Sequence, residues 1–446
     1  MYSLFDIEKK YKSELENIEE WAYLRSYYRQ AISYGGDKVR KISKLDSIKN
    51  MFYGFSSWFR RYKYFIFSDT SERRVVDGKL FDKSVDYIIN TLDKNNSLLI
   101  EEPSPSKHFL QDDISTKNIT SRRILDLLAL ILEKIIFKKY FYKTLDKINQ
   151  DYNINMNYTI QINRFNARYI LYKFILKLYK VELIIINCYY SKQYILKAAH
   201  DLNIKTIEVQ HGVIGKENDA YRSNIKLNTK YFPQCLLSFG ENEISILKDK
   251  GVITKQVISV GSFYLEYLLN TFTINKDLNH TIKDYKYSIG VSLQKGSEEL
   301  VLDFINKVSK EDDSILYIII PRVFNKKLYD KYNFSNNIIF FPSLDCYQIV
   351  MHCDYHCTFY SACAIETPTL NIPNILLNFN DDAKKYYDII DGKTSKTVNN
   401  TQEFLNILYT NYFENIDIMK NNSIFIKNNY KENIKQLKKD SIFDTN

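Results

Sequence analysis

Short apolar runs alternate with helix-length segments through most of the chain, and this alternation limits the possible folds more than any other feature. "VELIIIN" (181–187) is followed by the helical pattern "SKQYILKAAHDLN" (191–203) and then by "IKTIEVQ" (204–210). A continuous apolar run is typical of a strand with both faces buried, and a helix is the usual connection between parallel strands. The alternation therefore predicts βαβ units built around a parallel sheet.

Residues 270–285, "NTFTINKDLNHTIKDY", interrupt the alternation, which then starts again at "YSIGVSL" (287–293). The last strand that we expect is "NILLNF" (374–379). Two parallel sheets joined by a linker predict an α/β fold of two Rossmann-like domains that face each other across a cleft. We place the N-terminal domain, with a helical beginning, at 1–265, the linker at 266–285, the C-terminal domain at 286–420 and a helical tail at 421–446.

The size and charge of the chain narrow the possible classes of function. With 446 residues, the chain exceeds the usual size of a single hydrophobic core. Its formal net charge of +9 favours anionic partners. The lysines are spread along the whole chain rather than gathered in a basic block, so we do not expect nucleic acid to be a partner. Six cysteines in a chain of this length argue against a disulfide scaffold.

No apolar run is long enough to predict a transmembrane helix. The longest, "ILDLLALILEKIIF" (124–137), is interrupted by charge and falls short of the roughly 20 residues that span a bilayer. The first residues, "MYSLFDIEKKYKSELENIEEW", are charged throughout, unlike a signal peptide. We therefore expect a cytoplasmic protein that associates loosely with anionic lipid at the inner face of the plasma membrane, in a salt-sensitive way.

The predicted strand at 204–210 ends in Gln210-His211-Gly212, and a long polar loop follows. In open parallel sheets, ligands bind beyond the carboxyl ends of the strands. Gly212 would let the backbone approach a ligand closely or would take a positive φ, and His211 would place an imidazole that titrates near neutrality in the crevice. The alternative is a turn histidine whose ring is satisfied by the local backbone.

Around this turn the chain resembles GT-B glycosyltransferases, especially the bacterial enzymes that build capsule, O-antigen (lipopolysaccharide O-chain) and other surface polysaccharides. In those families a QHG-like turn follows a strand, and segments like "SFGEN" (238–242) and "SVGSF" (259–263) close the first domain. "CDYHCTFYSACAIETPTLNIPNILLN" (353–378) is similar to their donor-binding segment and to that of the nonhydrolysing UDP-sugar 2-epimerases. Asp354, Ser361, Glu366 and Pro373 match, whereas Asn371 stands where the family usually has glycine. The resemblance covers about residues 181–380.

The resemblance implies a nucleotide-sugar donor bound by the C-terminal domain. The turn at Ser361 and the helix after it are suited to a phosphate, and the resemblance gives Glu366 the ribose hydroxyls. Lys295 and Ser297 are candidates for the donor diphosphate, with Gly296 permitting a close approach, although the spacing is not that of a P-loop. Arg322 stands where many of these enzymes carry a basic residue after His-Pro, and the histidine is missing here.

The acceptor is expected on the N-terminal domain. The polar segment "DTSERRVVDGK" (69–79) follows the first predicted strand, and we expect it to be a loop that carries Asp69, Arg73 and Arg74 on the acceptor side. If the reaction inverts configuration, His211 is the candidate general base. If the reaction retains it, His211 orients the donor or the acceptor. Glu217 and Asp219, in the following loop, are the other candidates for the base.

The function that follows is transfer of a sugar from a nucleotide-activated donor to a lipid-linked or growing glycan acceptor, with no cofactor beyond the donor substrate. Three alternatives remain open: a UDP-sugar 2-epimerase, a polyol-phosphate transferase of the teichoic-acid type, and a nucleotide-binding scaffold without activity. Against the first, Ile365-Glu366 replaces the usual acidic pair, and against the second, no histidine precedes Arg322.

A cluster of possible metal ligands lies close to the donor segment. Zinc sites use cysteine and histidine ligands, and residues 346–363 hold both types. No C-x-x-C pair occurs among them, and the expected helix, turn and strand would scatter the side chains, so we expect no metal site. The cluster consists of Cys346, His352, Cys353, His356, Cys357 and Cys363.

Overall fold

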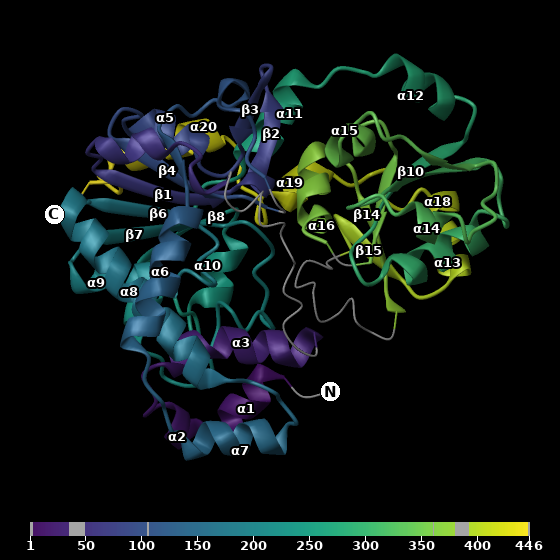
Figure 1. Ribbon diagram of the computed structural model, residues 1–446. Helices are drawn as coiled ribbons and strands as arrows, with labels where there is room; N and C mark the ends of the chain where they lie inside the picture. Colours follow the sequence, from purple (N-terminus) through teal and green to yellow (C-terminus); the bar gives the residue numbers. More distant parts are fainter. Residues whose placement is uncertain (1–2, 35–49, 105–106, 360, 380–391, 445–446) are drawn as a thin grey trace.

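The computed structural model describes residues 3–34, 50–104, 107–359, 361–379 and 392–444. Two α/β domains lie side by side, each built around a parallel sheet (Figure 1). The predicted architecture of two Rossmann-like domains is therefore confirmed. Among the described residues, no helix is both long enough and apolar enough to cross a bilayer.

The N-terminal sheet has seven parallel strands within the described residues. In spatial order they are β5 (Ile119–Ser121), β4 (Ser97–Glu102), β1 (Tyr64–Asp69), β6 (Leu183–Asn187), β7 (Lys205–Val209), β8 (Cys235–Ser238) and β9 (Gln256–Ser259). The central strands are buried on both faces, which explains their continuous apolar runs.

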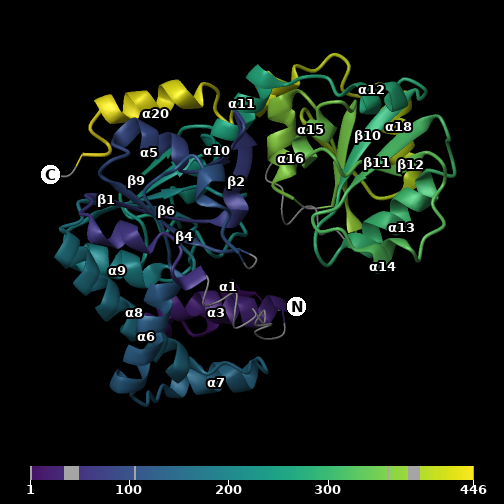
Figure 2. The same ribbon diagram turned by 45° about the horizontal axis from the view of Figure 1, so that its top comes forward.

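Helices cover both faces of this sheet (Figure 2). One face carries a large core that joins it to the helical N-terminal segment, and the other face packs against a separate core. The first group comprises α1 (Leu4–Lys10), α2 (Lys12–Leu15), α3 (Trp21–Tyr34), α6 (Arg123–Ile136), α7 (Lys143–Asp151), α8 (Tyr158–Tyr179), α9 (Gln193–Asp201) and α10 (Asn242–Leu247). The second comprises α5 (Asp86–Leu92), α11 (Phe263–Thr271) and α20 (Tyr430–Lys439). Short 3-10 turns are η1 (Phe55–Phe59), η2 (Thr70–Glu72), η3 (Gln111–Asp113) and η4 (Thr229–Tyr231).

The C-terminal sheet has six parallel strands within the described residues. Their order is β12 (Ile338–Phe340), β11 (Ile315–Ile320), β10 (Tyr287–Ser292), β13 (Tyr355–Thr358), β14 (Asn374–Leu377) and β15 (Ser395–Val398). The helices are α13 (Glu298–Val308), α14 (Lys326–Tyr329), α15 (Cys346–Val350), α16 (Cys363–Glu366) with the turn η5 (Thr367–Leu370), α18 (Thr401–Tyr409) and α19 (Ile418–Asn422).

Three elements differ from the sequence-based expectation. The expected linker contains a helix, α12 (Lys276–Ile282), whose first turn is capped by the Asn275 side chain. The strand at 374–379 is not the last one, because β15 pairs with β14 beyond it. The expected loop at 69–79 contains β2 (Arg73–Val76), which pairs with β3 (Lys79–Asp82) as an antiparallel hairpin.

The hairpin turns at Asp77-Gly78, where φ is 50° and 75°. Two consecutive residues with positive φ belong to the turn whose twist matches a two-residue hairpin, and Asp-Gly is a preferred pair for it. The expectation of a loop was wrong because the charged residues hid this signal. Arg73 and Arg74 accordingly lie on a strand rather than on a loop.

The C-terminal segment returns from the second domain to the first. The backbone N–H of Lys427 donates to the carbonyl of Phe239 at 2.8 Å, and the N–H of Asn242 donates to Ile424 at 3.0 Å. A Cβ on Gly240 would lie 2.2 Å from the Ile424 carbonyl oxygen, and one on Gly261 would lie 2.1 Å from that of Lys427. The glycines of the "SFGEN" and "SVGSF" segments are therefore required by the close approach of the returning chain.

Candidate functional site

The candidate site lies at the carboxyl ends of three adjacent strands in the centre of the N-terminal sheet. β1, β6 and β7 are neighbours, and they end at Asp69, Asn187 and Val209. The segments that follow carry Cys188, whose φ is 60°, and His211. Burial raises the pKa of the Cys188 thiol, the Lys192 charge opposes this, and the Asp69 carboxylate adds a smaller increase.

His211 is held against the rim of the N-terminal domain. Its ring meets Tyr190 edge-on, with centroids 5.4 Å apart, and its Nδ1 atom is buried with no hydrogen-bond partner among the described residues. Burial lowers the pKa of His211, and the nearby carboxyl groups of Glu208 and Glu72 oppose this only in part. The imidazole is therefore neutral at neutral pH, which is the form that accepts a proton.

Gln210 holds the turn that carries His211. Its amide nitrogen donates to the carbonyl of Gly212 at 2.8 Å and to Oε1 of Glu243 at 3.0 Å. Its amide oxygen accepts the backbone N–H of Phe239 at 2.6 Å. Burial raises the pKa of Glu243 to about 7. Sequence reasoning missed this clamp, although Gln210 and Phe239 lie within the segments that it singled out and Glu243 directly follows "SFGEN".

Glu208 lies inside the sheet, directly behind the turn. Its Oε1 atom accepts the Tyr189 backbone N–H at 2.9 Å and the Tyr221 hydroxyl at 2.8 Å. The other oxygen has no partner among the described residues. Burial raises the pKa of Glu208 to about 8. A protonated, uncharged Glu208 contributes little opposing charge, so burial, the largest cause, lowers the pKa of His211 and keeps the imidazole neutral at neutral pH.

Gly212 faces open space. A Cβ at this position would have no atom within 4 Å, and its φ is not in the positive range. Of the two roles expected for Gly212, a close approach to a ligand is thus the one that this geometry allows. The positive φ does not occur.

Lys83 and Glu72 are two charged residues near His211 that sequence reasoning did not find. Both belong to the segments around the hairpin, and their charged groups are 3.8 Å apart. Lys83 is one of the charges that lower the pKa of His211, after burial as the main cause. It also lowers the pKa of Cys363 at the beginning of α16, where the hydrogen bond with Cys346 is the main cause. Lys83 is therefore close enough to both His211 and the donor segment for its charge to act on each.

The two basic candidates of the C-terminal domain come together after β10 and β11. Nη1 of Arg322 donates to the side-chain oxygen of Gln294 at 3.0 Å, which ties the loop after β11 to the loop that carries Lys295. Lys295 and Arg322 are exposed. Gly296 has a φ of 92° and open space where a Cβ would stand, so the turn needs glycine. Ser297 is buried, and its hydroxyl donates to the carbonyl of Gln294 at 3.1 Å.

Glu366 is buried at the junction of the two domains. Its Oε2 atom accepts the Tyr347 hydroxyl at 2.5 Å. The Tyr347 ring meets Tyr264 of α11 edge-on, and the Tyr264 hydroxyl donates to Asp345 at 2.7 Å. One oxygen of Glu366 is thus held by the protein, and this fixes the carboxylate in place beside the interdomain contact.

The turn before α16 is stabilised by its own serine. The backbone N–H of Cys363 donates to the Ser361 hydroxyl at 3.3 Å, so this N–H is already used within the protein. α16 has four residues, which leaves a smaller helix dipole than the resemblance implied. Asn371 has a φ of 65°, a conformation that asparagine tolerates better than most residues, and this explains how it replaces the usual glycine.

The three acceptor-side candidates have different surroundings. Asp69 accepts the backbone N–H of Ser71 at 3.0 Å and caps η2. The Arg73 side chain is fully buried and pairs with Glu101 at 2.8 Å and Asp86 at 3.4 Å, so it is engaged by the protein's own carboxylates. Arg74 donates to two backbone carbonyls of the same segment and is partly exposed.

The cysteine and histidine residues of 346–363 have separate roles. His356 is fully buried, bonded to Ser292 at 2.8 Å and Asn374 at 2.7 Å, and burial lowers its pKa to about 4. His352 accepts the Asn275 backbone N–H at 2.7 Å. Among the described residues, no group of three metal-ligating side chains is placed to hold an ion.

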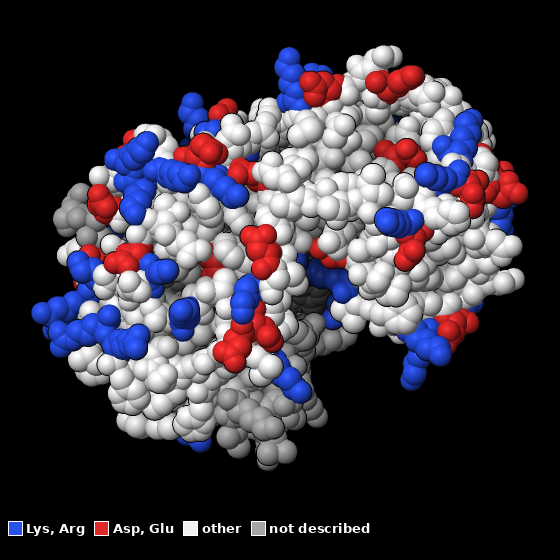
Figure 3. Space-filling model, turned by 90° about the horizontal axis from the view of Figure 1, so that it is seen from above, with Lys and Arg blue, Asp and Glu red and all other residues white. Residues whose placement is uncertain are grey.

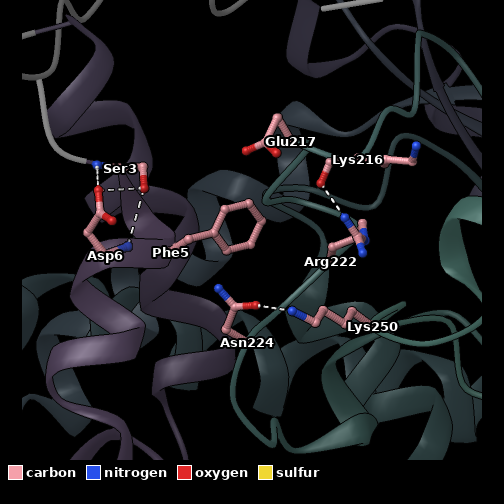
Figure 4. A pocket seen from close by; sticks show the side chains of 8 residues that line it. All are labelled: Ser3, Phe5, Asp6, Lys216, Glu217, Arg222, Asn224 and Lys250. Atoms are coloured by element: carbon pink, nitrogen blue, oxygen red, sulfur yellow. Dashed lines mark hydrogen bonds between the residues drawn. The ribbon is translucent and has the colours of Figure 1, made fainter. Parts of the chain in front are cut away.

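The space between the domains is open to the surface. Figure 3 shows the hollow between the two lobes, with lysine and arginine atoms on its wall. A separate cavity of about 300 Å³ lies between α1 and the loop that follows His211. Figure 4 shows α1 side chains on one side of it and loop side chains on the other. Its lining is Ser3, Phe5, Asp6, Lys216, Glu217, Arg222, Asn224 and Lys250.

Asp219, the other candidate base in that loop, lies near Arg29, with 3.5 Å between its carboxylate and Nη1. Burial raises the pKa of Asp219, and the Arg29 charge opposes this. Glu217 lines the separate cavity. Of the three candidate bases, His211 is therefore the one that lies at the strand ends beside Lys83.

Comparison with known proteins gives structural matches only, since no family model and no curated protein matches the chain. A UDP-GlcNAc 2-epimerase from Methanocaldococcus jannaschii, in complex with UDP-GlcNAc and UDP, matches with a TM-score of 0.53 and 13% identity, over 85% of this chain and 99% of its own. A UDP-GlcNAc 2-epimerase from Neisseria meningitidis, bound to UDP-GlcNAc, matches with a TM-score of 0.51 and 15% identity, over 86% of this chain and 99% of its own.

A third solved structure belongs to a different class of enzyme. Sucrose-phosphate synthase from Thermosynechococcus elongatus matches with a TM-score of 0.51 and 10% identity, over 86% of this chain and 100% of its own. At these identities the likeness concerns the fold. This chain has the two-domain GT-B fold, in which two Rossmann-like domains with parallel sheets stand side by side.

Proposed function

We propose that the protein is a glycosyltransferase that moves a sugar from a nucleotide-activated donor to a lipid-linked or growing surface-polysaccharide acceptor. The observation that carries the proposal is His211, a neutral imidazole at the carboxyl end of β7. A turn histidine with a purely structural role would have its ring satisfied by the backbone. The Nδ1 atom of His211 is instead buried without a partner among the described residues, as expected of a group that a ligand completes.

In this proposal the donor lies against the C-terminal domain. Lys295 and Arg322 neutralise the charge that develops on the departing nucleotide phosphate, and Lys83 approaches it from the N-terminal domain. Glu366 accepts hydrogen bonds from the ribose with the carboxylate oxygen that Tyr347 does not occupy. No metal ion is needed for this stabilisation.

The acceptor lies against the N-terminal domain, beside Asp69 and Arg74, while the open space at Gly212 lets the backbone approach the donor. In an inverting reaction, His211 takes the proton of the acceptor hydroxyl while its oxygen attacks the anomeric carbon. The bond from that carbon to the phosphate oxygen breaks, and the electron pair leaves with the nucleotide. General-base catalysis of this kind contributes about 10²–10⁴-fold in rate.

A second candidate, a UDP-sugar 2-epimerase, is favoured by the solved structures named above, two of which are UDP-GlcNAc 2-epimerases. Ile365, which stands where the resemblance leads us to expect the first of two acidic residues, is buried in the core of the domain junction. The glycosyltransferase is therefore our first choice.

One experiment separates the two functions. Thermal-shift measurements with UDP, GDP, CDP, CMP and dTDP identify the nucleotide, since a bound ligand raises the apparent stability by about 2.7 kcal/mol at a hundredfold excess over its Kd. The matching nucleotide sugars are then incubated with the protein, with and without a glycan-lipid extract. Acceptor-dependent release of nucleotide supports transfer. Acceptor-independent formation of the 2-epimer would establish the second candidate instead.

A further inference from the structure

Helices α6 and α8 present a broad apolar face on the outside of the N-terminal domain. The face is formed by Leu127, Ile131 and Ile135 on α6 and by Ile170, Phe174 and Leu178 on α8, all of them exposed. The two helices lie side by side, away from the second domain (Figures 1 and 2). An exposed apolar area of this extent on a soluble domain marks an interaction site.

The spacing shows that the face is not an accident of single residues. On each helix the three residues named are four positions apart, so that they form a stripe along one side, and on α6 the exposed Leu128 and Leu130 widen it. The opposite side of α6 buries Leu125 and Ala129 in the core. A helix that is apolar on both sides normally has an apolar partner on each. The exposed side of α6 has none among the described residues.

The apolar face continues beyond α6. Phe137 and Phe141, in the loop that follows the helix, are 49% and 83% exposed. Lys138 and Lys139 stand between them, and Lys134 stands beside Ile135, all three exposed. These lysines form no ion pair with another described residue. Exposed cations are thus interleaved with the exposed apolar residues.

The acidic residues of this region are already neutralised. α6 contains Asp126 and Glu133, and both are mostly buried. Asp126 lies 3.4 Å from Arg122 and 3.6 Å from Arg168, and Glu133 lies 3.8 Å from Arg164. α8 has no acidic residue in its sequence. The free charge of the apolar face is therefore positive.

We propose that this face docks onto an anionic lipid bilayer. Leucine, isoleucine and phenylalanine side chains enter the boundary between headgroups and acyl chains, while the lysines extend to the lipid phosphates. Charge complementarity selects this occupant over a second copy of the chain. A twofold dimer through the same face would bring its cations against each other, and α6 and α8 carry no unpaired carboxylate to balance them.

The position of the face fits the candidate site. α6 begins at Arg123, directly after β5, and therefore starts at the carboxyl ends of the parallel strands, where His211 also lies. Docking would hold this edge close to the bilayer surface, where a lipid-linked acceptor resides. Only this link to the acceptor rests on the proposed function, because lipid binding itself requires no reaction.

The test is co-sedimentation of the full chain with vesicles, without donor or acceptor. Vesicles contain either phosphatidylcholine alone or equal parts of phosphatidylcholine and phosphatidylglycerol. We expect binding to the anionic vesicles only, and a decrease of more than tenfold for the double variant Ile135→Glu/Phe174→Glu. Lys138→Ala/Lys139→Ala should weaken binding by about fivefold for each lysine removed.

The matched control is Ile274→Glu/Leu300→Glu, which changes two exposed apolar residues elsewhere in the chain and should bind like the unmodified protein. Circular dichroism melting verifies that every variant is folded. Unchanged vesicle binding by Ile135→Glu/Phe174→Glu would overturn the proposal, as would equal binding to neutral vesicles. Sedimentation velocity tests whether a second copy of the chain occupies the face instead. If the unmodified protein is a dimer, and Ile135→Glu/Phe174→Glu is a monomer that binds lipid as before, the face serves self-association.

Discussion

The side-chain amide of Gln210 lies 3.0 Å from Oε1 of Glu243, so the turn after β7 is bonded to the beginning of α10 after β8. Through its own oxygen, Gln210 also accepts the Phe239 backbone N–H. One buried side chain thereby fixes two successive strand ends relative to each other. The conformation of the turn that carries His211 depends on this bond, not on His211 itself.

Gln210→Ala should therefore lower both stability and activity. The substitution leaves the Phe239 N–H and one oxygen of Glu243 without their partner in the interior, which costs about 1–3 kcal/mol. Urea unfolding measures this loss, and Gln150→Ala, at an exposed position on α7, is the control that should change little. A Gln210→Ala protein as stable as the control would contradict the role of the clamp.

His211→Ala should damage transfer much more than folding. Removal of a general base typically costs 10²–10⁴-fold in rate, whereas the ring makes no hydrogen bond through Nδ1 to the described residues. We expect an unchanged Tm, nearly unchanged nucleotide binding and a collapse of sugar transfer. His211→Asn keeps a hydrogen-bonding group but cannot take up a proton near neutrality, so it should be equally slow. Near-normal turnover by His211→Asn would show that the base lies elsewhere or that the reaction retains configuration.

Glu366→Ala should weaken nucleotide binding by about 1.5–3 kcal/mol, the usual strength of hydrogen bonds to a charged group. The control is Tyr347→Phe, which removes the 2.5 Å bond to Glu366 but leaves the carboxylate that is proposed to hold the ribose. Calorimetry with the nucleotide found by thermal shift gives both affinities. Unchanged affinity in a folded Glu366→Ala protein would reject the ribose assignment, and an equal loss in Tyr347→Phe would indicate a structural effect on the domain junction.

Glu208 should make stability depend on pH. Its pKa is about 8 in the folded protein, because of burial, and 4.5 as a model value for the unfolded chain. Between these values the unfolded chain releases the proton while the folded protein keeps it, so the free energy of unfolding falls as pH rises from about 4.5 to about 8. Glu208→Gln stays neutral throughout and should lose this part of the dependence, which amounts to a few kcal/mol at roughly 1.4 kcal/mol for each pKa unit.

Urea unfolding of both proteins at pH 5 and pH 8 checks this expectation. The free energy of unfolding of Glu208→Gln, compared with that of the unmodified protein, should be higher at pH 8 than at pH 5. An identical difference at the two pH values would mean that Glu208 ionises normally inside the sheet.

The sequence predicts the parts of this fold that repeat a local pattern. Buried parallel strands must be apolar on both faces, so β6, β10 and β11 could be found from their composition. The β2–β3 hairpin was missed because its strands are short and charged, and the Asp77-Gly78 turn is its main sequence signal. Once the hairpin forms, Arg73 turns inward to Glu101 and Asp86, a long-range contact that no spacing along the chain encodes.

The candidate site shows the same division. His211 could be predicted as a site residue because the end of a strand is a local feature of the sequence. Arg322 could be predicted for the same reason, because it follows the end of a strand. Lys83 and Glu72 could not, since their position near His211 depends on how the hairpin folds against the sheet. The Ser361 turn could be located, but not the use of its hydroxyl by the Cys363 N–H.

The return of the C-terminal segment onto Gly240 and Gly261 means that the two domains are joined by two covalent crossings, one after α11 and one after α19. A body attached at two points can rotate only about the line through them. Two such crossings, acting as fixed points, would restrict relative motion of the domains to opening and closing about one axis. The direction in which Arg322 and Lys295 could move relative to His211 is therefore set by where the chain crosses beside Gly240 and Gly261.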